Sequence, residues 1–146
     1  MKYILLVAAL LVSSSVAAKE ISETEYNTVL KEINTPDNQE KVKSFLNNLD
    51  NFNIGGSQDI DVLWSFYHAS GSRRIVEKII QLLDDKSFST GNAQINQIVS
   101  NAARLSLAAN AGRYNKVRQI ILDSANSLPN GPLKQKLLQI INQISQ

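Results

Sequence analysis

The sequence contains no cysteine, and this absence removes several kinds of chemistry at once. Without cysteine a chain forms no disulfide, holds no thiolate-bound metal, has no cysteine nucleophile and lacks the lipidated cysteine of a bacterial lipoprotein. The only histidine is His68, so any metal site would depend on carboxylates. We therefore expect no metal and no cofactor, and a fold that is stabilised by its apolar core alone.

A strong net charge is also missing. The formal net charge of +2 gives no indication of a nucleic-acid partner. The charges are unevenly distributed, because residues 19–99 carry 8 basic and 12 acidic residues (net −4) whereas residues 100–146 carry 6 basic and 1 acidic residue (net +5). This asymmetry either marks a face for an acidic partner or an anionic membrane surface, or lets the two halves attract each other within one fold.

Long apolar runs are absent apart from one near the start. Tyr3–Val12 is apolar, follows Lys2 and precedes small residues that end at Ala18, which is the pattern of a secretory signal peptide. Cleavage after Ala17 or after Ala18 fits the pattern, and we favour Ala18. The run is shorter than the ~20 residues that span a bilayer. We predict that residues 1–18 are removed and that the mature chain, without a transmembrane segment, is periplasmic or secreted in a bacterium.

Strand signals are missing, because no run of alternating apolar and polar residues is bounded by turn residues. Apolar residues recur instead at helical spacings of three and four. We predict an all-α single domain of about seven short helices, near residues 22–33, 36–49, 59–70, 73–83, 92–111, 113–122 and 133–144. The loop Asn53–Ser57 would divide a helical N-terminal arm, residues 19–56, from a body of helical hairpins, residues 57–146.

Two stretches share one pattern at an offset of 41 residues. Residues 59–85 form a predicted helix, a break at Gly71 and a return helix, and residues 104–124 repeat this pattern about Gly112. Phe66 corresponds to Leu107, and Val76 to Val117. The pattern predicts antiparallel helical hairpins. Two copies fit a solenoid-like repeat, and they also fit a chance likeness between two helical hairpins.

The hairpin residues also carry a resemblance to known proteins. Residues 59–125 resemble a group of small exported bacterial all-helical proteins of unassigned function, which combine an LD-x-LW-x-x-F-x-A-T-G-like hairpin with a later A-A-x-x-S-L-x-x-N-A segment. The residues concerned here are Ile60-Asp61-Val62-Leu63-Trp64, Phe66, Ala69-Ser70-Gly71, Ala102-Ala103, Ser106-Leu107 and Asn110-Ala111. Serine stands at position 70 in place of the usual threonine. Residues 105–117 resemble the two-helix core of an ankyrin repeat. The resemblance implies a helical fold and transfers no functional residue.

Candidate chemistry is sparse. Asp61, Ser65 and His68 lie four and three residues apart and so share a helix face, which would bring a carboxylate, a hydroxyl and an imidazole together. Side chains on consecutive turns of one helix fan outward, however, and do not converge on a substrate. The alternative is that His68 packs beside Trp64. No phosphate-binding loop is present, since Gly55-Gly56 lacks the following lysine and serine or threonine. We expect a protein that is not an enzyme.

The most notable polar feature is a set of cations after the two glycines. Arg73 and Arg74 follow Gly71, and Arg113 follows Gly112. Cations at a helix start oppose the helix dipole unless an anion is bound there. We predict an exported, non-enzymatic module that binds another protein through this surface. The alternative is a ligand- or lipid-binding protein with an apolar groove between hairpins. The candidate binding residues are Arg73, Arg74, Arg113, Trp64, Tyr67 and His68, with Phe66 also lining the groove in the alternative.

Overall fold

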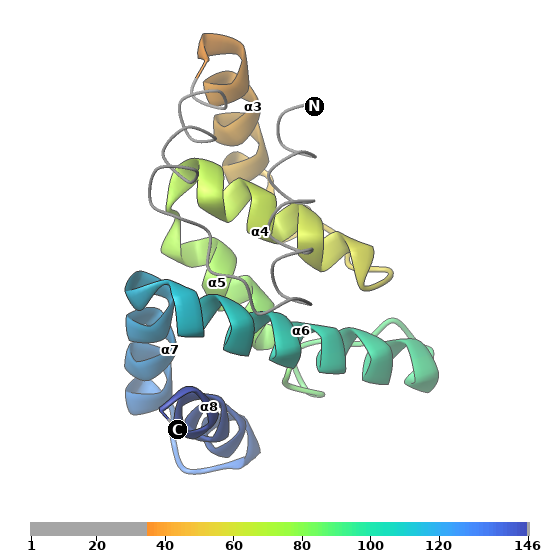
Figure 1. The fold of residues 1–146 in the computed structure, drawn as a ribbon. Helices are drawn as coiled ribbons and strands as arrows, with labels where there is room; N and C mark the ends of the chain where they lie inside the picture. Colours follow the sequence, from red (N-terminus) through yellow and green to blue (C-terminus); the bar gives the residue numbers. More distant parts are fainter. Residues whose placement is uncertain (1–34, 146) are drawn as a thin grey trace.

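The computed structural model describes residues 35–145, and every regular element in that range is a helix (Figure 1). Six α-helices and one short 3₁₀ helix form a single domain. The helix predicted at residues 22–33 and the predicted cleavage site lie outside the described residues. The bounds are α3 Pro36–Asn47, η1 Leu49–Asn51, α4 Gln58–Ser70, α5 Arg73–Gln81, α6 Ala93–Arg113, α7 Asn115–Ser127 and α8 Pro132–Ile144.

Three helix starts follow from local sequence. Thr35 caps α3 by accepting a hydrogen bond from the Asn38 amide, with Pro36 at the first helical position, where its missing amide proton is not needed. Asn92 caps α6 by accepting from two backbone amides. Pro132 opens α8 at its first helical position. The starts predicted at residues 36, 92 and 133 lie within one residue of the observed ones, because caps and prolines act over a few residues and need no tertiary contact.

The two glycines at the 41-residue offset behave differently. Gly71 ends α4 with φ at +66°, in the left-handed region, and its amide donates to the carbonyl of Tyr67. Gly112 was expected to end the other helix, and this expectation is wrong: α6 continues through it to Arg113 and ends at Tyr114, whose φ and ψ are −120° and 110°. The helix predicted at residues 113–122 therefore starts at Asn115, as α7, and Gly112 forms no turn.

The helices are stacked approximately in chain order, from α3 at one end of the molecule to α8 at the other (Figure 1). α5 lies in the middle and contacts α4, α6 and α7. Its apolar residues share one face because they are spaced by one, three and four positions, and Ile75, Val76 and Ile79 are fully buried. Burial of these side chains holds the helices on both sides of α5 together.

The first helix in the described range joins this core through aromatic contacts. The ring of Phe45 in α3 stacks on that of Phe66 in α4, with centroids 3.8 Å apart, and also meets Phe52 at 5.1 Å. Leu49 in the 3₁₀ helix is buried as well. α3 therefore packs directly against the helices that follow the Asn53–Ser57 loop. Within residues 35–145, no helix has the length and hydrophobicity needed to cross a membrane.

Candidate functional site

The turn between α4 and α5 is fixed by hydrogen bonds around Gly71. The hydroxyl of Ser70 donates to the carbonyl of Phe66 at 2.6 Å and accepts from the amide of Ser72 at 3.1 Å. Because glycine closes α4 without strain, α5 starts two residues later, at Arg73. The first turn of α5 contains no acidic residue, so two adjacent arginines occupy the positively polarised end of the helix.

The two arginines have different partners. Arg73 donates from Nε to Oε1 of Glu77 at 2.7 Å and from Nη1 to Oδ2 of Asp123 at 3.2 Å, and these hydrogen bonds raise the pKa of the Arg73 guanidinium. Arg74 donates from Nη1 to the carbonyl of Leu46 at 3.3 Å, and its Nη2 lies 3.6 Å from Oδ1 of Asp50. The Asp50 side chain is 90% exposed, so water screens this second pair. Arg73 is held by two carboxylates, whereas Arg74 has one solvent-exposed carboxylate at 3.6 Å and one carbonyl.

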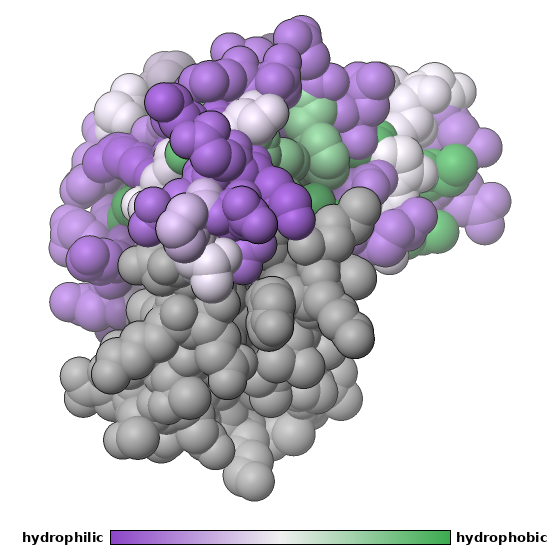
Figure 2. Space-filling model, turned by 90° about the horizontal axis from the view of Figure 1, so that it is seen from above, coloured by the Kyte–Doolittle hydropathy of each residue, from purple (hydrophilic) through white to green (hydrophobic). Residues whose placement is uncertain are grey.

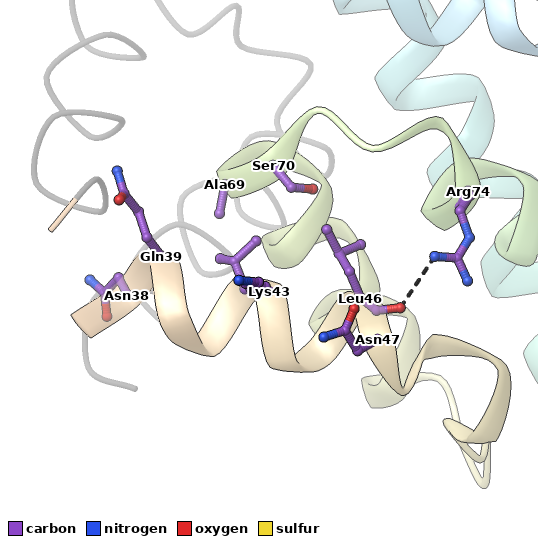
Figure 3. Close-up of a pocket in the computed structure, with 9 residues that line it drawn as sticks. Asn38, Gln39, Lys43, Leu46, Asn47, Ala69, Ser70 and Arg74 are labelled. Carbon is purple, nitrogen blue, oxygen red and sulfur yellow. Dashed lines mark hydrogen bonds between the residues drawn. The ribbon is translucent and has the colours of Figure 1, made fainter. Parts of the chain in front are cut away.

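Arg74 stands at the edge of a groove between α3 and the α4–α5 turn (Figure 3). The groove has a volume of about 490 Å³. Its lining residues come from three helices and are Asn38, Gln39, Val42, Lys43, Leu46, Asn47, Ala69, Ser70 and Arg74. We call this feature the α3 groove. Among the described residues, the lining combines apolar side chains with amides and the two cations Lys43 and Arg74, and it includes no carboxylate.

The surface around the α3 groove is mainly hydrophilic. Seen from above the view of Figure 1, the described residues are mainly hydrophilic, with hydrophobic residues visible at several places between them (Figure 2). The amide of Asn38 is mostly buried at the start of α3, whereas Lys43 and Asn47 are exposed. A short apolar contact with amide and cationic groups at its margin suits an extended peptide that carries an acidic side chain.

A buried aromatic cluster lies on another face of α4. The ring of His68 is 4.9 Å from that of Tyr114, 5.2 Å from that of Tyr67 and 6.1 Å from that of Trp64, measured between centroids. Nε2 of His68 lies 3.2 Å from Oδ1 of Asn110, which joins α4 to α6. The Asn110 amide nitrogen donates to the carbonyl of Ser106, so its oxygen faces the imidazole and accepts the proton on Nε2.

This arrangement keeps His68 neutral. Its side chain is 3% exposed, and burial lowers its pKa to about 4 despite the opposing effect of the Asn110 hydrogen bond. The hydroxyl of Ser65 donates toward the carbonyls of Asp61 and Val62 in its own helix rather than to the imidazole. Burial raises the pKa of the Asp61 carboxyl. The three side chains that share a helix face in the sequence thus do not form a hydrogen-bonded triad in the structure.

The structure distributes the six predicted binding residues over several places. Trp64 and Tyr67 are buried in the core beside His68. Arg74 lines the α3 groove, Arg73 binds Glu77 and Asp123, and Arg113 is half-buried at the end of α6. A second hollow, of about 420 Å³, lies between residues 52–55 and residues 87–90, and neither Trp64 nor Tyr67 lines it or the α3 groove.

Residues of α3 were missed as part of a site. Residues 36–49 were assigned to the N-terminal arm for their apolar stripe of Val42, Phe45, Leu46 and Leu49, and none of them was predicted to bind. In the structure Val42 and Leu46 line the groove together with Asn38, Lys43 and Asn47. The available signal was the position of these polar residues next to the stripe. Within residues 35–145, no three histidine, aspartate or glutamate side chains are grouped closely enough to hold a metal ion.

Comparisons with known proteins found no match. No family model, no curated protein and no solved structure is similar to this chain.

Proposed function

We propose that the protein is an exported, non-enzymatic helical module that binds another protein through the α3 groove. The difference between the two arginines carries this proposal. Arg73 is held by two carboxylates of its own chain, whereas Arg74 stands in the groove with an exposed carboxylate at 3.6 Å and the Leu46 carbonyl at 3.3 Å. A guanidinium in this position has remaining donors for an incoming carboxylate.

The groove itself favours a peptide segment as the ligand. A volume of about 490 Å³ accommodates two or three side chains, and the lining includes backbone-like amide donors and acceptors on Asn38, Gln39 and Asn47. Lys43 supplies a second cation on the α3 side of the groove. We infer that the partner presents an apolar side chain to Val42 and Leu46, and an acidic side chain to Lys43 and Arg74.

Export and the repeat arrangement belong to the same proposal. Residues 1–18 have the pattern of a signal peptide, which would deliver the module to the periplasm or the exterior of a bacterium. The contacts of α4 with α5, of α6 with α7 and of α5 with α7 support two antiparallel hairpins that stack on one another. In this arrangement α3 covers one end of the stack and forms the binding groove there.

Charge reversal at the groove tests the binding proposal. We expect the exported chain to capture a stoichiometric protein partner, and the double variant Lys43→Glu/Arg74→Glu to lose it. Lys41→Glu and Lys136→Glu together are the matched control, because neither lysine lines the groove and this double variant undergoes the same change in net charge as Lys43→Glu/Arg74→Glu. Far-ultraviolet circular dichroism would verify that both variants remain helical. Equal capture by the wild type and the double variant would exclude the α3 groove as the binding site.

The same purification also tests the alternative function, in which the protein binds a lipid or another small ligand instead of a protein partner. A lipid or small apolar molecule bound to the wild-type chain, without a protein partner, would favour a ligand-binding role. Mass spectrometry of both protein and lipid fractions distinguishes the two results.

A further inference from the structure

The second hollow, between residues 52–55 and residues 87–90, is separate from the α3 groove. It lies at the C-terminal end of α5 and has a volume of about 420 Å³. None of the described residues that line it also lines the α3 groove. Sites for small molecules are concave and largely preformed, and they combine apolar walls with a few polar groups that orient the ligand. The second hollow has each of these properties.

Hydrogen bonds within the chain hold both walls of the second hollow in place. On the first wall, the carboxylate of Asp59 accepts from the amides of Gly55 and Gly56, at 2.7 and 3.1 Å. On the second wall, Oδ1 of Asn96 accepts from the amide and the hydroxyl of Thr90, at 2.8 and 2.7 Å. Because these contacts already order the two loops, a ligand would lose little free energy in ordering them.

Apolar side chains from both loops and from the end of α5 line the second hollow. Ile54 and Leu82 belong to the buried core, and the rings of Phe52 and Phe88 are half-buried and pack against that core. The surface that these side chains leave exposed faces water when the hollow is empty. A ligand with an apolar chain or ring would remove part of this surface from water, which favours its binding.

Lys78 is the charged side chain of the second hollow. Among the described residues that line the hollow, no other carries a charge. Burial lowers the pKa of the Lys78 ammonium, an effect that the charge of Asp50 opposes without cancelling. Within residues 35–145, no ion pair joins Lys78 to a carboxylate, and Asp50 lies 3.6 Å from Arg74 instead. An ammonium that has lost part of its water without gaining a partner favours an anion beside it.

Ser89 supplies a second donor from the opposite loop. Its hydroxyl oxygen accepts from the amide of Gly91 and from Nδ2 of Asn96, both at 3.2 Å. A hydroxyl whose oxygen accepts two hydrogen bonds keeps its own proton for a further acceptor. Ser89 and Lys78 both line the second hollow. Together they offer a hydroxyl and an ammonium to the two oxygens of one carboxylate.

We propose that the second hollow binds a small amphipathic monocarboxylate. Lys78 and Ser89 hold its carboxylate, and its apolar chain or ring lies against Phe52 and Phe88. A single cation matches one negative charge, whereas a phosphate dianion would retain an unpaired charge. The apolar walls disfavour a small inorganic anion, which has no apolar surface to bury. This site shares no described lining residue with the α3 groove, so it does not depend on the proposed binding of another protein.

Titration of the exported chain with 3-phenylpropionate, followed by amide chemical shifts in nuclear magnetic resonance, tests the proposal. We expect shifts in residues 52–55 and 87–90, with a dissociation constant on the order of 0.1–1 mM for a ligand of this size. The neutral 3-phenylpropionamide and the small anion acetate should each bind at least about tenfold more weakly, because one lacks the charge and the other lacks the apolar part. Absence of shifts in the two loops, or equal binding of either control compound, would overturn the proposal.

Substitutions at the two donors separate a specific site from a general effect of charge. Lys78→Met keeps the length of the side chain without its charge and should weaken binding of 3-phenylpropionate by at least about tenfold. Lys86→Met is the matched control, because Lys86 is exposed, is close in sequence to the second loop and does not line the hollow. Ser89→Ala changes no charge and should weaken binding by about two- to tenfold. Equal weakening by the two lysine variants would contradict a role of Lys78 in the site.

The titration of Lys78 itself gives a readout that needs no substitution. A carboxylate beside the ammonium favours the charged form, so binding of 3-phenylpropionate should raise the pKa of Lys78 from its lowered value. Nuclear magnetic resonance of the lysine side chains as a function of pH, with and without the ligand, measures this change. An unchanged pKa of Lys78 in the saturated complex would show that the carboxylate is held elsewhere and would rule out the proposed site.

Discussion

The two helix pairs, α4 with α5 and α6 with α7, carry a glycine at equivalent positions and use it in different ways. Gly71 has φ at +66° and ends α4, whereas Gly112 lies inside α6. Among the described residues, the atom nearest to a Cβ on Gly112 would be Ile144 Cγ2, at 3.8 Å, which is an ordinary contact. Tyr114 ends α6 instead, and its amide donates to the carbonyl of Asn110. The contacts around a glycine, and not its place in a pattern, decide whether a helix stops there.

The same two pairs also differ in what covers their equivalent faces. Trp64 is 3% exposed and its counterpart Leu105 is 59% exposed. His68 makes a buried hydrogen bond, and its counterpart Ala109 carries no polar side chain. A shared helical pattern therefore leads to a core in one pair and to a surface in the other.

The largest expected effect concerns Trp64 and Leu105. Trp64→Ala should lower the free energy of unfolding by about 3–5 kcal/mol, because it leaves a large cavity. Leu105→Ala should change it by less than about 0.5 kcal/mol, since the side chain is mostly in water. Urea unfolding measures both values. Trp64→Phe should cost less than Trp64→Ala, and similar losses at positions 64 and 105 would contradict the difference in burial.

Lowering the pH is expected to reduce the free energy of unfolding nearly as much as Trp64→Ala does, because of His68. The pKa of His68 is about 4 in the folded chain and 6.5 ordinarily. Stability is full above pH 6.5, where the imidazole is neutral in both states. As the pH falls from 6.5 to 4 the unfolded chain binds a proton that the folded chain does not, so the free energy of unfolding falls by about 3 kcal/mol.

The matched variant for this prediction is His68→Gln, which has no titrating group at this position. Subtracting its pH profile from that of the wild type removes the contribution of carboxylates. Parallel profiles between pH 4.5 and 6.5 would show that His68 does not have the lowered pKa.

The smallest expected changes in the free energy of unfolding come from alanine at the two glycines, and they have opposite signs. Gly71→Ala should destabilise the chain by about 1–2 kcal/mol, because alanine is strained in the left-handed conformation that Gly71 adopts, with φ at +66°. Gly112→Ala should stabilise it by up to about 1 kcal/mol, because alanine favours a helix interior and the nearest contact is an ordinary one. Thermal denaturation would detect both shifts, and shifts of the same sign would mean that the two glycines are equivalent after all.

Local signals were sufficient for much of the fold. The caps at Thr35 and Asn92 and the proline at position 132 fixed helix starts, and helical spacing identified the buried face of α5. Gly112 was misassigned because its sequence neighbourhood resembles that of Gly71, whereas in the structure only Gly71 has a left-handed φ and α6 continues through Gly112.

The candidate site was less predictable, because its contacts connect distant residues. The Arg74–Leu46 hydrogen bond spans 28 residues, and the His68–Asn110 pair spans 42. One signal was available for the second pair: Asn110 follows Val99, Ala103 and Leu107 on the buried face of α6, where an amide needs a polar partner. No comparable signal connects α3 to Arg74.

The chain-order stacking of the helices has a consequence for how the protein folds. Among the helices of residues 35–145, each pair in substantial contact is separated by at most one other helix. Contacts between near neighbours in sequence close short loops and lose little chain entropy, which is the condition for rapid folding. We therefore expect residues 35–145 to fold rapidly for a domain of this size.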